Sequence, residues 1–158
     1  MSEETVYHVR CVLESQPGFE WNKGHVNTSA EAAKILSFIR DCDHEHLAIL
    51  CLSNKNVPLA YSVTAMGSGN NTRVNPGELL RVPLLAGASA FVIAHNHPSG
   101  DIHPSRSDRA LTERIAEAAR LLGLRFLDHL IIGPEGPHYS FADYGQIPEP
   151  ITTGACEL

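Results

Sequence analysis

The 158-residue sequence lacks long hydrophobic runs, an excess of positive charge and closely spaced cysteines. No run approaches the roughly 18 consecutive apolar residues that cross a bilayer, so a membrane-spanning protein is not expected. The 12 Lys and Arg residues are outnumbered by 18 Asp and Glu residues, which gives a formal net charge of −6. This balance argues against a protein that holds duplex DNA by neutralising its phosphates, because that requires a basic face.

The cysteine pattern and the N-terminal residues bear on the cellular compartment. Four cysteines, at positions 11, 42, 51 and 156, form no Cys-x-x-Cys pair. In a chain of this length they indicate reduced thiols and a cytoplasmic protein. The first ten residues, MSEETVYHVR, contain no apolar segment of the kind found in secretory signals. With 43% hydrophobic residues, the chain is expected to fold as one domain with a substantial core.

Hydrophobic patterning predicts an α/β fold of the mixed α+β kind, with helices packed on a mixed β-sheet. Strands are expected at residues 5–13, 45–52, 59–65, 88–94 and 126–132, and helices at 29–40, 76–85 and 105–122. Thr28 and Glu31 form a capping-box signature at the start of the first helix. Pro83 is expected to kink the second helix, because proline removes one intrahelical donor.

The same reading divides the chain into three parts. Residues 1–27 are expected to form an N-terminal strand and loop, 28–146 the main folded domain, and 147–158 a flexible tail. A polar loop, expected to be flexible, lies at 67–72.

The segment HNHPSGDIHPSRSD carries the most chemical information. His95 and His97 are two residues apart at the end of a predicted strand, so both imidazoles share a face. Asp108 lies in the first turn of the following helix, which the Pro/Gly turn can fold back over the strand end. Two histidines and one aspartate with a water as fourth ligand make an open tetrahedral zinc site. Ser105-x-x-Asp108 is equally typical of a simple helix cap, so the local pattern leaves both interpretations open.

Other polar residues offer weaker alternatives. His44 and His46 also share a face, but they lack a serine or aspartate companion and are interpreted as surface or strand-end residues. Asp101 lies in the turn, and Glu78 favours a helix N-terminus. The letters HNH do not indicate an HNH nuclease, whose motif residues are far apart on a ββα unit.

The pattern His-x-His-x7-Ser-x-x-Asp, formed by His95, His97, Ser105 and Asp108, resembles the JAMM motif of JAB/MPN metalloproteases. The segments AHNHPSGD, PSRSD, LLGLRFLDHLIIG and YSFADYG are similar to the JAB domain of the bacterial RadC family. The likeness extends from about residue 28 to residue 145.

The resemblance implies a fold, a metal and a set of roles. His95, His97 and Asp108 would bind Zn²⁺ together with a water molecule. The segment DHEHLAILCLSNKN resembles the part of the family that supplies an upstream glutamate, which assigns proton transfer to Glu45. Ser105 would donate a hydrogen bond to the developing oxyanion. The implied activity is that of a zinc metallopeptidase or isopeptidase acting on a protein or peptide, such as a ubiquitin-like conjugate, as in deubiquitinase-like relatives.

Two other functions remain open at this stage. One is a nucleic-acid-associated factor in repair or recombination, and the other is a non-catalytic MPN scaffold. RadC proteins usually carry an N-terminal helix-hairpin-helix region, and a different short segment is expected before the domain here, so nucleic-acid binding is not favoured. His103 and the pair Asp128–His129 are expected near the site, with ordinary strand or loop roles favoured over support of a ligand imidazole.

Overall fold

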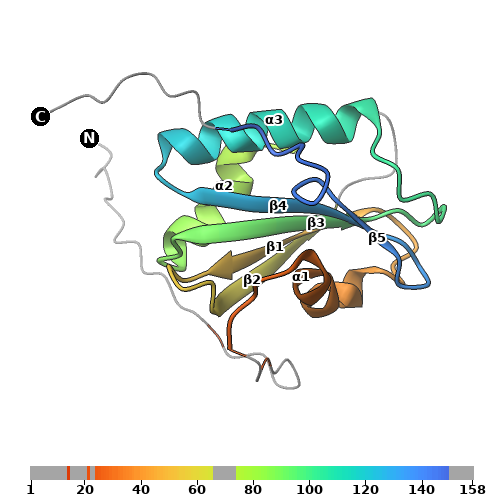
Figure 1. The fold of residues 1–158 in the computed structure, drawn as a ribbon, viewed down its shortest axis with the longest axis horizontal. Helices are drawn as coiled ribbons and strands as arrows, with labels where there is room; N and C mark the ends of the chain where they lie inside the picture. Colours follow the sequence, from red (N-terminus) through yellow and green to blue (C-terminus); the bar gives the residue numbers. More distant parts are fainter. Residues whose placement is uncertain (1–13, 15–20, 22–23, 66–73, 150–158) are drawn as a thin grey trace, which may run out of the picture.

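The computed structural model describes residues 14, 21, 24–65 and 74–149. The predicted strand at 5–13, the loop at 67–72 and most of the predicted tail lie outside this part of the chain. The described residues form a five-stranded sheet in the order β2-β1-β3-β4-β5. Helix α1 covers one face, and α2 and α3 cover the other (Figure 1). The predicted mixed α+β class is confirmed.

The sheet is mixed in strand direction. Its strands are β1 (His46–Leu52), β2 (Pro58–Ala65), β3 (Ala90–Asn96), β4 (Arg125–Ile132) and β5 (His138–Ser140). Strands β3 and β4 run parallel, because α3 connects them, and the other neighbouring pairs are antiparallel. Strands β1 and β3 are apolar on both faces, as expected for central strands that are covered by helices on both sides.

Two hydrophobic clusters occupy the two faces of the sheet. Alternate residues of β1 and β3 divide between them: Leu50 and Val92 pack on the α1 side, and Ile49 and Ile93 on the side of α2 and α3. Ile115, fully buried on α3, belongs to the second cluster. The metal-ligand candidates extend from this α2/α3 side, since His95 continues the alternation of β3.

Three helices flank the sheet: α1 (Ser29–Ile35), α2 (Pro76–Leu85) and α3 (Arg106–Leu121). The capping box predicted at Thr28 and Glu31 is confirmed. The first helix is shorter than the predicted 29–40, and a 3-10 turn follows at Ser37–Ile39. The hydroxyl of Ser37 donates to the carbonyl of Lys34 at 2.9 Å, a local bond that competes with helix continuation.

The other two helices lie at the predicted positions. Helix α2 has the predicted bounds and includes the buried Pro83, and the kink expected there stays a prediction. Helix α3 lies within the predicted range 105–122, with Ser105 as its N-cap residue. Leu122, the last residue of the predicted range, is the exposed C-cap residue that follows the helix.

Candidate metal centre

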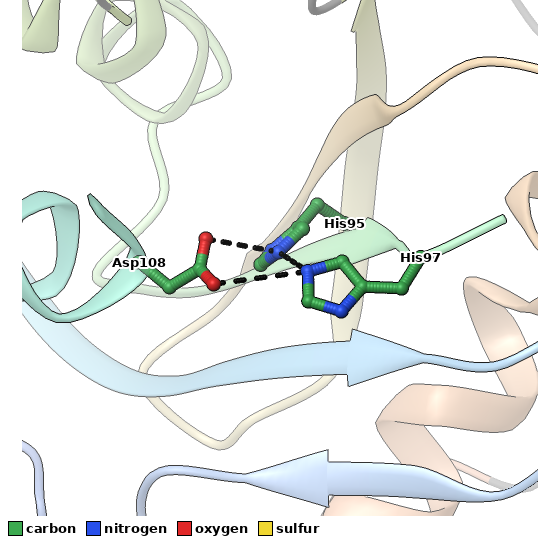
Figure 2. A group of neighbouring side chains, drawn as sticks. All are labelled: His95, His97 and Asp108. Atoms are coloured by element: carbon green, nitrogen blue, oxygen red, sulfur yellow. Dashed lines mark hydrogen bonds and ion pairs between the residues drawn. The ribbon is translucent and has the colours of Figure 1, made fainter. Parts of the chain in front are cut away.

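Three predicted ligands meet where β3 ends and α3 begins. His95 lies within β3, and His97 follows the strand with its backbone N–H bonded to the carbonyl of Ile132 on β4 at 3.0 Å. The chain then turns at Gly100, which has a φ of 84°, and returns to the start of α3. Both rings and the carboxylate of Asp108 point toward one another (Figure 2).

The donor atoms are spaced as a small cation requires. The Nε2 atoms of His95 and His97 lie 2.9 Å apart. Asp108 Oδ1 is 3.2 Å from His95 Nε2, and Asp108 Oδ2 is 3.7 Å from His97 Nε2. Ligand atoms bound at about 2.0–2.2 Å around a tetrahedral zinc ion lie roughly 3.3 Å apart. Shifts of a few tenths of an ångström would therefore suffice to fit this ion.

The hydrogen bonding of His97 directs one ring nitrogen into the site. Its Nδ1 lies against the backbone carbonyl of Asp101, and a carbonyl oxygen can only accept a hydrogen bond. Nδ1 therefore carries a proton, which leaves Nε2, the atom that faces His95 and Asp108, as the ring atom through which His97 can bind a metal ion. Two imidazoles and a carboxylate brought this close repel one another unless a metal ion or a proton lies among them.

Asp108 is held as a carboxylate although it is buried. Burial alone would raise its pKa, but contact with His95 and hydrogen bonds from Ser105 outweigh burial and hold the pKa well below its usual value. Oδ2 accepts from the backbone N–H of Ser105 at 2.7 Å and from its hydroxyl at 2.6 Å. The sequence left a metal ligand and a helix cap as alternatives; the capping box is present, and Asp108 also faces the two histidines.

Glu45 lies outside the group of three converging ligands. It is exposed and immediately precedes β1. Leu47 pairs with His95 across the antiparallel strands, so the chain at Glu45 approaches the level of His97. Glu45 is thus close in the strand register to the ligands, and its role in proton transfer stays a prediction. The oxyanion role of Ser105 also stays a prediction.

Asn96 is a residue that sequence reasoning missed. Its side chain is fully buried and points away from the faces of His95 and His97, as strand alternation requires. Asn96 Oδ1 accepts from the backbone of His46 at 2.6 Å, and Nδ2 donates to the carbonyls of His44 and Cys42. Asn96 therefore ties the segment that contains Glu45 to the ligand-bearing strand. The available signal was an asparagine between the two histidines, at the end of an apolar run.

Four other histidines were considered in the sequence: His44, His46, His103 and His129. His44 is exposed and pairs with Asp43, and His46 begins β1, as predicted. His103 is exposed and pairs with the carboxylate of Asp101. His129 is fully buried, and its Nε2 lies 2.9 Å from His95 Nδ1, which is the contact that support of a ligand imidazole requires.

Asp128, next to His129 in sequence, serves a structural purpose. It is buried, and it accepts hydrogen bonds from the Ser140 hydroxyl and from the backbone N–H groups of His129 and Ala142. Burial raises its pKa, although these three bonds act in the opposite direction. The bonds connect β4 to the segment after β5, which agrees with the ordinary strand or loop role favoured for Asp128 from the sequence.

Comparison with known proteins places this geometry in a family. A model described as a RadC-like JAB domain matches residues 26–146. The chain is 42% identical over 99 residues to a UPF0758 protein of Desulforamulus reducens, which covers 63% of this chain and 44% of the relative. It is 38% identical over 120 residues to the UPF0758 protein YeeS of Escherichia coli, covering 75% of this chain and 80% of that protein.

These relatives differ in length from the chain. This chain spans about half or less of the length of several relatives that it matches, for example 52% of a UPF0758 protein of Clostridium acetobutylicum. Within the described residues, none of the helices is long and apolar enough to cross a membrane.

Proposed function

The chain belongs to the RadC-like JAB domain family, and we propose that it is a zinc-dependent hydrolase of amide bonds. The observation that carries the proposal is the convergence of His95, His97 and Asp108, whose ligand atoms all lie within 4.8 Å of one another. Two imidazoles and one carboxylate suit zinc, and three protein ligands leave a position for a water molecule.

Each residue of the site has a distinct part in this proposal. His95, His97 and Asp108 hold the ion. When bound, zinc polarises a water molecule and lowers its pKa toward about 7. Glu45 accepts a proton from the attacking water at its carboxylate and delivers it to the leaving nitrogen. The Ser105 hydroxyl turns from Asp108 and donates to the oxyanion that develops at the scissile carbonyl.

A substrate that binds in extended form is consistent with the sheet. Strand β2 lies at one edge of the described sheet, and an edge strand presents backbone groups that can pair with an added peptide strand. Leu59 and Val63 are exposed on this strand. We propose that the substrate is the extended C-terminal tail of a protein, in a peptide or isopeptide linkage such as that of a ubiquitin-like modifier.

The test combines zinc content with amide hydrolysis. Zinc-loaded protein is incubated with a panel of ubiquitin-like proteins that carry a C-terminal amide-linked reporter. We expect His97→Ala to lose both zinc and hydrolysis, and Glu45→Gln to keep zinc but lose hydrolysis. Glu78→Gln, which removes an exposed carboxylate from the first turn of α2, is the matched control and retains both. Full hydrolysis by Glu45→Gln, or unchanged zinc content in His97→Ala, contradicts the proposal.

A further inference from the structure

A buried chain of hydrogen bonds connects two of the candidate ligands behind the metal site. His95 Nδ1 lies 2.9 Å from His129 Nε2, and His129 Nδ1 lies 2.7 Å from Thr112 Oγ1. Thr112 Oγ1 in turn donates to the backbone carbonyl of Asp108 at 2.8 Å. This series of hydrogen bonds therefore begins at a candidate ligand on β3, passes through His129 on β4 and ends at a candidate ligand on α3.

The chemistry of the groups fixes the direction of each bond. The carbonyl oxygen of Asp108 can only accept, so it takes the single hydroxyl proton of Thr112. Thr112 Oγ1 must then accept from His129, whose Nδ1 therefore carries a proton. A neutral His129 has a lone pair at Nε2, which accepts from Nδ1–H of His95. His95 is left with a lone pair at Nε2, the atom that faces His97 and Asp108.

The surroundings of His129 keep it neutral and oriented. Its side chain is fully buried. A positive charge on a ring buried in this way would be costly, which favours the neutral form. The ring is stacked on Phe141 with centroids 4.8 Å apart and an interplanar angle of 9°. This packing fixes the plane in which Nδ1 and Nε2 point.

We propose that His129, set by Thr112, is a positioning residue that holds His95 in the tautomer whose Nε2 is free to bind a metal ion. The alternative tautomer of His129 would place a proton on Nε2 and force His95 Nδ1 to accept. A neutral His95 would then carry its proton on Nε2 and could not be a ligand. This inference rests on the metal-binding part of the proposed function and is independent of any hydrolysis.

Thr112→Val and Thr112→Ser form a matched pair for the test. Valine has the shape of threonine without the hydroxyl, so Nδ1–H of His129 would be buried without an acceptor, which is costly. In this variant we expect the His129 proton to lie on Nε2. The proton of a neutral His95 would then also lie on its own Nε2, the atom that faces the metal site. Serine keeps the hydroxyl and is expected to keep the wild-type tautomers.

Two measurements read the outcome without an activity assay. Long-range ¹H–¹⁵N NMR on the metal-free proteins identifies which ring nitrogens carry protons, and competition with a chelator gives zinc affinity. We expect protons on Nδ1 of His95 and His129 in wild type and Thr112→Ser. In Thr112→Val we expect the His129 proton on Nε2 and zinc affinity lower by about 10–100-fold, the usual effect of losing an outer partner.

The result that overturns the proposal is equally direct. Wild-type protein with a proton on His129 Nε2, or Thr112→Val with unchanged zinc affinity and unchanged tautomers, would rule it out. The wild-type tautomers decide the matter even where Thr112→Val fails to fold. A protein that shows these tautomers and binds zinc, yet hydrolyses none of the substrates, would contradict the proposed hydrolase alone.

Discussion

Ser105 and Asp108 cap each other at the start of α3. The hydroxyl of Ser105 accepts from the backbone N–H of Asp108 at 3.2 Å, and Oδ2 of Asp108 accepts from the backbone N–H of Ser105 at 2.7 Å. Oδ1 of the same carboxylate lies 3.2 Å from His95 Nε2. The cap therefore does two things at once, since it begins the helix and aims a carboxylate oxygen at the histidines.

Loss of the Ser105 hydroxyl should weaken the protein without unfolding it. We expect Ser105→Ala to lower the free energy of unfolding by about 1 kcal/mol, the usual effect of removing an N-cap side chain. Urea unfolding measures the change. Ser105→Thr keeps a hydroxyl at the same position and should lose much less. Equal losses in the alanine and threonine variants would show that the cap does not account for the effect.

Zinc should stabilise the folded protein through Asp108. An ion that binds only the folded state raises the free energy of unfolding by about 2.7 kcal/mol at a free concentration 100 times its dissociation constant. We expect this rise in wild-type protein and in Glu113→Gln, a control that removes an exposed carboxylate on α3. Asp108→Asn keeps a capping oxygen but loses the charge, so its stabilisation should be much smaller.

Thermal unfolding of chelator-treated protein, with and without added zinc, measures this difference. A rise of the same size in Asp108→Asn would mean that zinc binds somewhere other than the proposed site.

The parts of the site that follow from local spacing could be predicted from the sequence. His95 lies near the end of β3 with His97 directly after it, and Ser105 and Asp108 flank the first turn of α3, so alternation and capping rules locate all four. The fold class could be predicted for the same reason, because the central strands and α3 have clear hydrophobic patterns.

Contacts between distant segments could not be predicted in this way. His129 is 34 positions from His95 in the sequence, and only the pairing of β3 with β4 brings their rings together. Glu45 was identified by family resemblance, because nothing in its neighbourhood distinguishes it from other exposed carboxylates. The early end of α1 depends on the Ser37 hydroxyl, which competes with the helix for the carbonyl of Lys34.

Asn96 should hold the segment before β1 through both ends of its amide. Asn96→Ala removes one acceptor and two donor contacts, so we expect a loss of about 1–3 kcal/mol in unfolding free energy. Asn96→Asp keeps the shape and the acceptor for His46 but directs a carboxylate oxygen at the carbonyls of Cys42 and His44. It should therefore be at least as unstable as Asn96→Ala near neutral pH.

Urea unfolding of both variants tests this account of Asn96. Wild-type stability in Asn96→Asp would contradict it, because the amide donors would then contribute nothing. Zinc affinity should change little in Asn96→Ala, since its side chain lies on the opposite face of β3 from the ligands.

Cys51 should react with alkylating reagents only after the protein unfolds. It is fully buried in the central strand β1, and burial raises the pKa of its thiol to about 12. The thiolate is the reactive form, and at about pH 9 an ordinary exposed thiol is largely ionised whereas Cys51 in the folded protein stays protonated. Cys42 is only partly buried and should be alkylated first. Mass spectrometry of the separate peptides follows the two rates.

Destabilisation by Asn96→Ala should accelerate alkylation of Cys51 in proportion to the larger unfolded fraction. Equal rates for Cys51 and Cys42 in the wild-type protein would mean that β1 is open to solvent, which is incompatible with a central strand covered on both faces.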